Sequence, residues 1–131
     1  MRYLGVDYGL KKVGLAISEG QIASPLKVLD ISGLNGAVSK ILQVINKEEI
    51  ERVIIGVPDS GQSRSIVKKF IAKLKTDLKD KLVSVIEADE TLSSSSAKDL
   101  VLDLGLGEKA RRQEDAYSAV IILQNFLDSI T

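Results

Sequence analysis

The sequence contains no cysteine and no histidine. Without cysteine the chain has no thiolate nucleophile, no disulfide and no cysteine-ligated zinc. Without histidine it has no Ser-His-Asp triad and none of the usual zinc sites. Aromatic residues make up only 4% of the 131 residues, which argues against a base-stacking platform for single-stranded nucleic acid. Any chemistry must therefore rest on carboxylates, lysine, arginine, hydroxyl groups or a bound hard cation.

The chain also lacks an excess of charge and a long apolar run. Eighteen basic residues balance eighteen acidic ones, so the basic excess typical of nucleic-acid-binding domains is missing. No apolar run is long enough to span a membrane, and an expected strand at the N-terminus leaves no room for a signal peptide. We therefore expect a cytoplasmic protein with no membrane partner. The length and the 44% of hydrophobic residues favour one domain, residues 1–131, with one core.

Hydrophobic periodicity predicts an α/β fold. The expected strands are Tyr3–Asp7, Val13–Ser18, Leu26–Ile31, Val53–Val57 and Leu82–Ile86, the last continuing towards Asp89. The expected helices cover Leu34–Ile45, Val67–Leu78, Ser95–Leu104 and about Gln113–Asp128. Three closely spaced strands followed by strand-helix alternation predict a mixed five-stranded sheet, with an antiparallel meander first, then parallel strands, flanked by helices.

Asp7 is the first candidate site residue. It lies at the carboxyl end of the first expected strand and shares one face with Tyr3 and Gly5 by the period of two. A carboxylate followed by glycine at a strand end is a common place for an active-site group. Aspartate also starts turns well, and on this feature alone a turn is the better interpretation.

Asp89 and Glu90 close the fifth expected strand. Strand alternation lets only one of them share a given face, and the sequence does not say which face meets a site. Either acid, with Thr91, could instead cap the next helix.

Asp115 lies on the last expected helix, on one stripe with Ala119, Ile122 and Phe126. This spacing aims Asp115 at the apolar side, whereas Glu114 falls more towards water. A buried charge is costly unless something pairs with it. The helix dipole also stabilises an acid in the first turn, which explains why an acid is present but not why it faces the apolar side.

Together the sequence offers two strand-end acids and one helix acid. Carboxylates that converge repel one another, so convergence is stable only with a cation between them. Oxygen ligands without histidine or cysteine indicate Mg²⁺ or Mn²⁺. Two such ions could activate a water and stabilise the leaving oxygen in phosphodiester hydrolysis.

Basic residues flank these acids and are candidate substrate-binding residues. They are Lys11, Lys12, Arg64, Lys109, Arg111 and Arg112. Local positive charge of this kind could hold phosphates despite the neutral total. Lysines in turns and arginines before a helix are also ordinary solvated surface, and the two interpretations are evenly balanced.

Five segments in order resemble the YqgF/RuvX family of ribonuclease H-like proteins. They are Leu4–Ser18 around Asp7, Ala23–Leu26, Ile54–Pro58, Asp89–Ser94 and Asp115–Asp128. The first is moderately specific alone, and all five in order are strongly so. Members are described as Holliday-junction resolvases and as nucleases that mature the 5′ end of 16S ribosomal RNA. The sequence departs from the family at Thr91, where arginine is common, and in a short loop after Pro58.

The resemblance implies that Asp7, Asp115 and an acid of the Asp89-Glu90 pair bind the metals. Glu90 is preferred, because the second acid of the family is usually the glutamate. We thus expect a metal-dependent nuclease, a monomer or homodimer, that processes precursor 16S ribosomal RNA or resolves branched DNA.

Two other functions stay open. One is a non-catalytic nucleic-acid or protein-binding module, which the departures at Thr91 and after Pro58 allow. The other is an ATP-handling enzyme of the actin and sugar-kinase superfamily, whose phosphate loop is also Asp-x-Gly after a strand. That superfamily encloses its nucleotide between two domains, and 131 residues favour one.

Overall fold

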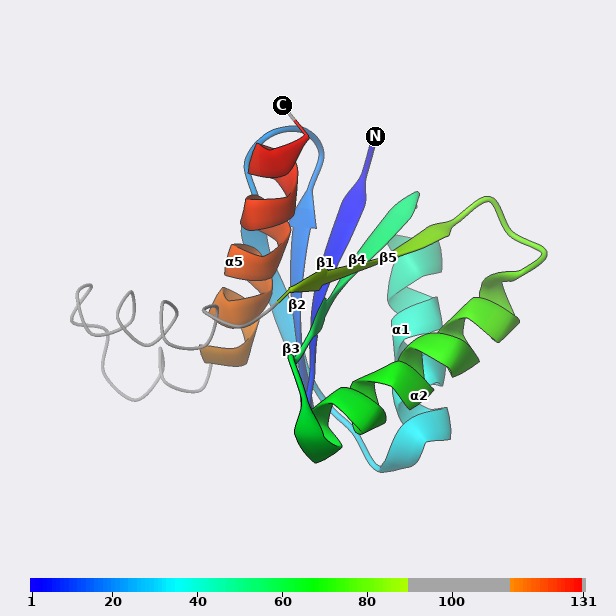
Figure 1. Ribbon diagram of the computed structural model, residues 1–131. Coiled ribbons are helices and arrows are strands. Elements are labelled where there is room, and N and C mark those ends of the chain that lie inside the picture. The colour runs from blue at the N-terminus through cyan, green and yellow to red at the C-terminus, as the bar shows by residue number, and fades with distance from the viewer. Residues whose placement is uncertain (90–113, 131) are drawn as a thin grey trace.

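The computed structural model describes residues 1–89 and 114–130, which form a sheet with helices on both faces (Figure 1). The strands are β1 (Tyr3–Tyr8), β2 (Lys12–Ser18), β3 (Ser24–Asp30), β4 (Arg52–Val57) and β5 (Ser84–Asp89). The helices are α1 (Gly33–Lys47), α2 (Gly61–Leu78) and α5 (Glu114–Ser129). The helix predicted over Ser95–Leu104 lies outside the described residues. None of the described helices combines the length and apolar character needed to cross a lipid bilayer.

The strands form one mixed sheet in the order β3-β2-β1-β4-β5. β2 pairs antiparallel with β1 and β3, whereas β4 pairs in parallel with β1 and β5. This confirms the predicted meander followed by parallel strands. Because β1, β4 and β5 run in one direction, their ends at Tyr8, Val57 and Asp89 lie at one edge, called the carboxyl edge below. The β1–β2 turn and the start of α2 lie there too (Figure 1).

The two faces of the sheet bury different residues of the same strands. On one face Leu4 and Val6 of β1 pack in the core beneath α1 and α2. On the other face Tyr3 of β1 and Ile54 of β4 pack against α5. β4 is apolar on both faces, as the run Val53–Val57 predicts for a strand with helices above and below.

Helix α5 packs on β1, β2 and β3 through a broader face than the predicted stripe. Ala119 and Ile122 are buried as predicted, but Ala116, Leu123 and Leu127 are buried too. Ser118, outside that stripe, is only 3% exposed as well. The reason is that α5 lies across several strands, and therefore buries a wide arc of its circumference. At its far end the Gln124 side chain accepts a hydrogen bond from Ala23 N–H and donates one to the Gln21 carbonyl, both 2.9 Å long.

Several element boundaries differ from prediction by a few residues, and two of these differences have clear local causes. β5 begins at Ser84, because Leu82 is fully exposed in the preceding loop. α2 begins at Gly61, in the segment predicted as loop, because its first turn is polar and exposed and gives no hydrophobic stripe. Gly61 has a φ of 82°, a conformation that side chains rarely adopt, so glycine suits this entry to the helix.

Candidate active site

Asp7 stands at the carboxyl edge on the face that α5 covers. β1 alternates, so Asp7 follows Tyr3 and Gly5 on that face, and it pairs across the sheet with Gly14 of β2. Its side chain is half-buried. The first prediction about the site, that a carboxylate ends the first strand, is thus realised in the centre of the sheet.

Gly5 lets α5 approach β1 closely. A methyl group at Gly5 would lie 2.8 Å from both the Ala119 carbonyl oxygen and the Leu123 Cβ, far inside normal contact. α5 runs antiparallel to β1 (Figure 1). Two residues of strand advance about 6.6 Å, the rise of about four helical residues. Asp7 therefore lies level with the first turn of α5, the turn that contains Asp115 in the sequence.

The second strand-end acid that the structure describes faces the other way. Asp89 pairs with Val57, whose side chain is in the core beneath α1 and α2. Ala88, one residue earlier, packs on the α5 side instead. Asp89 is therefore on the opposite face of the sheet from Asp7. Glu90 and the Asp115 side chain lie outside what the structure describes, so their roles stay predictions.

Within the described residues, no three acidic side chains gather closely enough to hold a metal ion. Of the three predicted catalytic acids, the structure describes the side chain of Asp7 alone.

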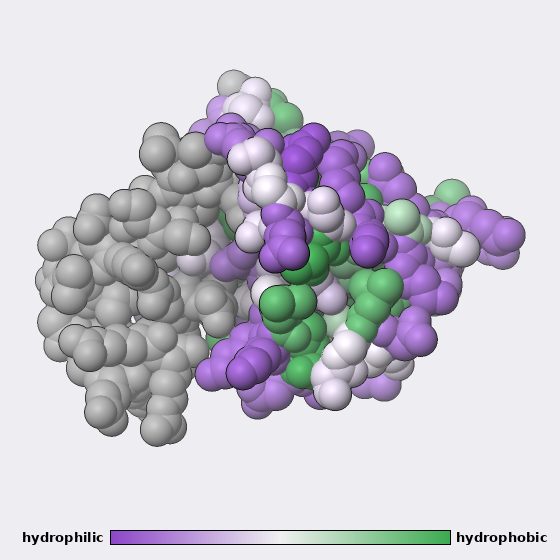
Figure 2. Space-filling model, turned by 60° about the horizontal axis from the view of Figure 1, so that its bottom comes forward, coloured by the Kyte–Doolittle hydropathy of each residue, from purple (hydrophilic) through white to green (hydrophobic). Residues whose placement is uncertain are grey.

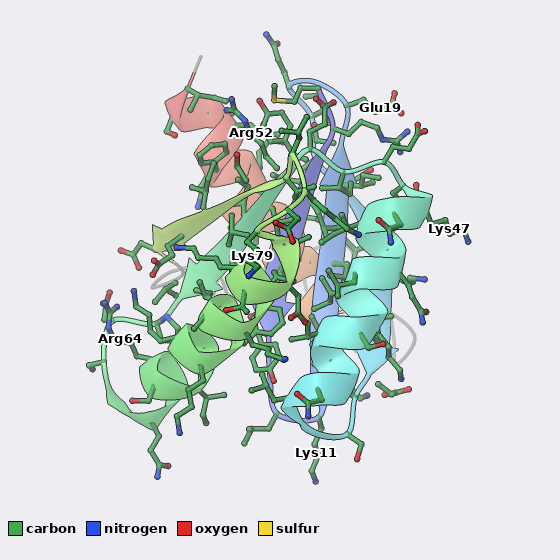
Figure 3. All side chains as sticks on the ribbon, turned by 90° about the vertical axis from the view of Figure 1, so that its right-hand side faces the viewer. Lys11, Glu19, Lys47, Arg52, Arg64 and Lys79 are labelled. Atoms are coloured by element: carbon green, nitrogen blue, oxygen red, sulfur yellow. The ribbon has the colours of Figure 1, made fainter. Side chains whose placement is uncertain are left out.

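The β1–β2 turn brings lysine to the same edge as Asp7. Gly9 N–H donates to the Lys12 carbonyl at 3.0 Å, and a Cβ at Gly9 would lie 2.8 Å from that oxygen. Glycine therefore keeps the turn tight. Lys11 and Lys12 are both exposed, and Lys11 projects at the end of the sheet (Figure 3). The two lysines follow Asp7 by four and five residues in the chain, and the turn keeps them at the edge where β1 ends.

Arg64 lies at the same edge but on the α2 side. Its Nη1 donates to the Pro58 carbonyl at 3.1 Å, which ties the first turn of α2 to the end of β4. An open pocket of about 320 Å³ lies here. It is lined by Val57, Asp59, Arg64, Glu87, Ala88 and Asp89. The other predicted arginines, Arg111 and Arg112, lie outside the described residues.

Figure 2 looks towards the carboxyl edge and shows an apolar patch within largely hydrophilic surface. Leu10, in the β1–β2 turn between Gly9 and Lys11, is 69% exposed. The described surface around Asp7 thus offers both cationic and apolar contacts.

The family model that matches this chain covers residues 1–129 and is that of RuvX, Holliday junction resolvase. The chain belongs to the RuvX family. Several relatives carry the name "Putative pre-16S rRNA nuclease". That of Maridesulfovibrio salexigens is 35% identical over 97% of this chain and 98% of the relative. That of Thermoanaerobacter pseudethanolicus is 33% identical over 98% of this chain and 97% of the relative. That of Flavobacterium psychrophilum is 32% identical over 96% of this chain and 96% of the relative.

Solved structures show the fold of this RuvX-family chain. T. thermophilus RuvC in complex with a Holliday junction substrate has a TM-score of 0.69 at 18% identity, covering 99% of this chain and 96% of RuvC. The fowlpox virus Holliday junction resolvase has a TM-score of 0.70 at 13% identity, covering 100% of both chains. The predicted ribonuclease H-like fold is confirmed.

Tyr8 was not among the predicted site residues, although it follows Asp7. It points to the other face of the sheet, where its ring stacks on Phe70 of α2 with centroids 4.2 Å apart and planes 12° apart. The stack joins the end of β1 to α2. Burial raises the pKa of the Tyr8 hydroxyl above its ordinary value of 10.0. Alternation along β1 could have indicated the face, but not the aromatic partner.

The raised pKa of Tyr8 predicts an alkaline loss of stability in this RuvX-family chain. The native state favours neutral Tyr8, so its contribution is complete below the ordinary pKa of 10.0 and is lost as pH rises through the higher native pKa. Tyr8→Phe keeps a stacked ring and removes the ionisable group. We expect urea denaturation to give a shallower fall in unfolding free energy above about pH 10 for the variant. An unchanged alkaline slope would contradict the assignment.

Proposed function

We propose that this RuvX-family chain is a metal-dependent nuclease that hydrolyses phosphodiester bonds near the 5′ end of precursor 16S ribosomal RNA. The observation that carries the proposal is the position of Asp7, half-buried at the carboxyl end of the central strand and level with the first turn of α5. The names of the relatives support the choice of substrate. We further propose that residues 1–131 form one nuclease domain and act in the cytoplasm.

We assign the metal-binding role to Asp7, Glu90 and Asp115, with Asp89 as the alternative strand-end acid. The described geometry favours Glu90 over Asp89, because Asp89 faces away from Asp7. A donor set of carboxylates alone suits Mg²⁺ or Mn²⁺. Such ions, when bound, polarise the phosphate and lower the pKa of an attacking water. Asp7 would hold its part of the site rigidly, since β1 pairs on both sides and α5 packs over it.

The basic residues at the carboxyl edge would position the substrate. Lys11 and Lys12 reach solvent from the turn beside Asp7, and Arg64 reaches the edge from the α2 side. Cations at such places attract phosphates without reading the sequence of bases. Arg111 and Arg112, just before α5 in the sequence, would add to this set.

The test compares two labelled substrates, a precursor RNA with its 5′ extension and a four-way DNA junction. Each is incubated with purified protein in Mg²⁺ or Mn²⁺ and, separately, with a chelator. We expect metal-dependent cleavage of the RNA near the mature 5′ end. Preferred cleavage of the junction would support the second candidate function, a resolvase, which the description of the matching family favours. Binding of both substrates with cleavage of neither would overturn the nuclease and leave a binding module.

A further inference from the structure

Helix α2 is strongly basic although the chain as a whole is neutral. Between Gly61 and Leu78 it contains five lysine or arginine residues and a single acid, Asp77. The whole chain has eighteen residues of each sign. Positive charge is therefore concentrated on this helix at the expense of the rest of the molecule.

Four cations line one flank of this helix and form what we call the basic row: Arg64, Lys68, Lys75 and Lys79. Their spacings of four, seven and four residues bring them to the same side. Glu87 of β5 lies against this flank and accepts a hydrogen bond from Lys68. That bond holds the pKa of Glu87 below its usual value, with smaller effects from the charges of Lys75 and Arg64. Lys68, Lys75 and Arg64 therefore lie around the Glu87 carboxylate of β5.

The basic row keeps a positive balance. Among the described residues Lys68 forms an ion pair with Glu87, while Arg64, Lys75 and Lys79 take part in no ion pair within 4.0 Å. Lys75 and Lys79 are exposed. The opposite flank differs, because Lys73 pairs with Asp77 at 3.7 Å.

The row begins at the carboxyl edge, on the α2 side of the sheet, and leads away from that edge. Arg64 lines the pocket at the carboxyl edge, and Lys79 lies at the far end of the helix (Figure 3). Fifteen residues of helix separate them, a rise of about 22 Å. A DNA duplex, with a rise of about 3.4 Å per base pair, spans that length in about six base pairs. The β1-to-β5 distance across the sheet is about 10 Å, two strand spacings, so Asp7 and the head of the row lie at the same sheet edge, about two strands apart and on opposite faces.

We propose that the basic row binds the sugar-phosphate backbone of a helical arm of the substrate, extending about six base pairs from the scissile bond. The proposal rests on the proposed function, because it takes nucleic acid as the substrate. It adds that the enzyme recognises a double-helical arm beside the cleaved strand. Backbone contacts of this kind are independent of sequence and weaken with salt.

The test is the double substitution Lys75→Gln with Lys79→Gln, in the full chain. Glutamine and lysine have similar helix propensities, so α2 should form normally. Binding is measured in chelator, to stop cleavage, with a labelled RNA that carries a duplex arm of about twelve base pairs. We expect Kd to rise by tenfold to a hundredfold at about 0.1 M salt, and the salt slope to fall by about 1.4 to 1.8.

The matched control is Lys69→Gln with Lys73→Gln, which removes the same charge from the opposite flank of the same helix. We expect Kd and the salt slope to stay near the wild-type values. An equal loss in both double variants, or in neither, would overturn the basic row as a binding surface.

Glu87→Gln provides a test in which binding is expected to tighten instead of weaken. It removes the acid that pairs with Lys68 and so raises the positive charge of the row. We expect severalfold tighter binding of the same RNA and a steeper salt slope, since one more cation can contact phosphate. Weaker binding by this variant would contradict the proposal.

The two proposals fail in distinguishable ways. If wild-type protein cleaves in metal but the two lysine double variants bind alike, the basic row is wrong and the nuclease stands. If the Lys75 and Lys79 variant binds more weakly than its control while no preparation cleaves any substrate, the row stands and the nuclease is wrong. A substrate shortened to two or three base pairs of duplex should be bound equally by the wild type and both lysine double variants, since its arm ends before Lys75.

Discussion

Asp7→Asn should abolish cleavage while leaving the protein folded. Asparagine has the same shape but lacks the charge that a hard cation requires. Metal-ion catalysis supplies several kcal/mol of transition-state stabilisation, so we expect cleavage to fall by about 10³-fold or more. Single-turnover cleavage of the precursor RNA in Mn²⁺ measures the loss, and far-UV circular dichroism with thermal melting establishes that the variant is folded.

Asp30→Asn is the matched control for Asp7→Asn. Asp30 also ends a strand at the carboxyl edge, but its strand, β3, is at the side of the sheet and its side chain is exposed. We expect cleavage within about twofold of wild type, as for surface substitutions in general. If Asp7→Asn cleaved as well as Asp30→Asn, the three-acid site would be wrong.

Gly5→Ala should reduce both stability and cleavage. The added methyl group would lie 2.8 Å from the Ala119 carbonyl and the Leu123 Cβ, so α5 must move away from β1. Overpacking of this kind costs about 1–3 kcal/mol, which in a chain of this size lowers Tm by roughly 3–12 °C. The loss of cleavage should exceed the loss that the unfolded fraction of the variant explains, because the displaced helix carries Asp115. Differential scanning calorimetry and cleavage at a temperature where the variant is fully folded separate the two effects.

Gly36→Ala makes the same chemical change where nothing opposes it. Gly36 lies within α1, and no atom is within 4 Å of the position that its Cβ would take. Alanine is the better helix former, so we expect a gain of about 0.5–1 kcal/mol in unfolding free energy and unchanged cleavage. A Gly5→Ala protein with wild-type Tm would show that α5 is not held against β1 by this contact.

The sequence predicted most of the fold because each element carries its own periodic signal. Short apolar runs revealed β1, β2 and β4, since these strands are buried on both faces and have few polar positions. The start of α2 was missed, because its first turn at Gly61 is exposed on all sides and has no apolar residue before Ile66.

The candidate site was less predictable because it depends on pairs of residues far apart in the chain. Alternation separates Asp89 from Glu90 in principle, but only the pairing of Asp89 with Val57 shows that Asp89 faces α2. The role of Gly5 could not be predicted from its place near Asp7, because it depends on the close approach of Ala119, which is far away in the chain. The Tyr8–Phe70 stack was unpredictable for the same reason, since the two residues are far apart in the chain and neither one identifies the other.

The contact between Gly5 and α5 also has a kinetic consequence. The two segments are separated by more than a hundred residues, and all five strands lie between them or beside them in the chain. Closing so long a loop is entropically costly and slow, and local contacts form first. The meander and the α1–β4–α2 layer can therefore assemble while the other face, with Tyr3, Ala16 and Ile54, is still exposed to water. During synthesis this apolar face stays exposed until α5 docks, so the unfinished chain is open to non-specific association with other exposed apolar surfaces.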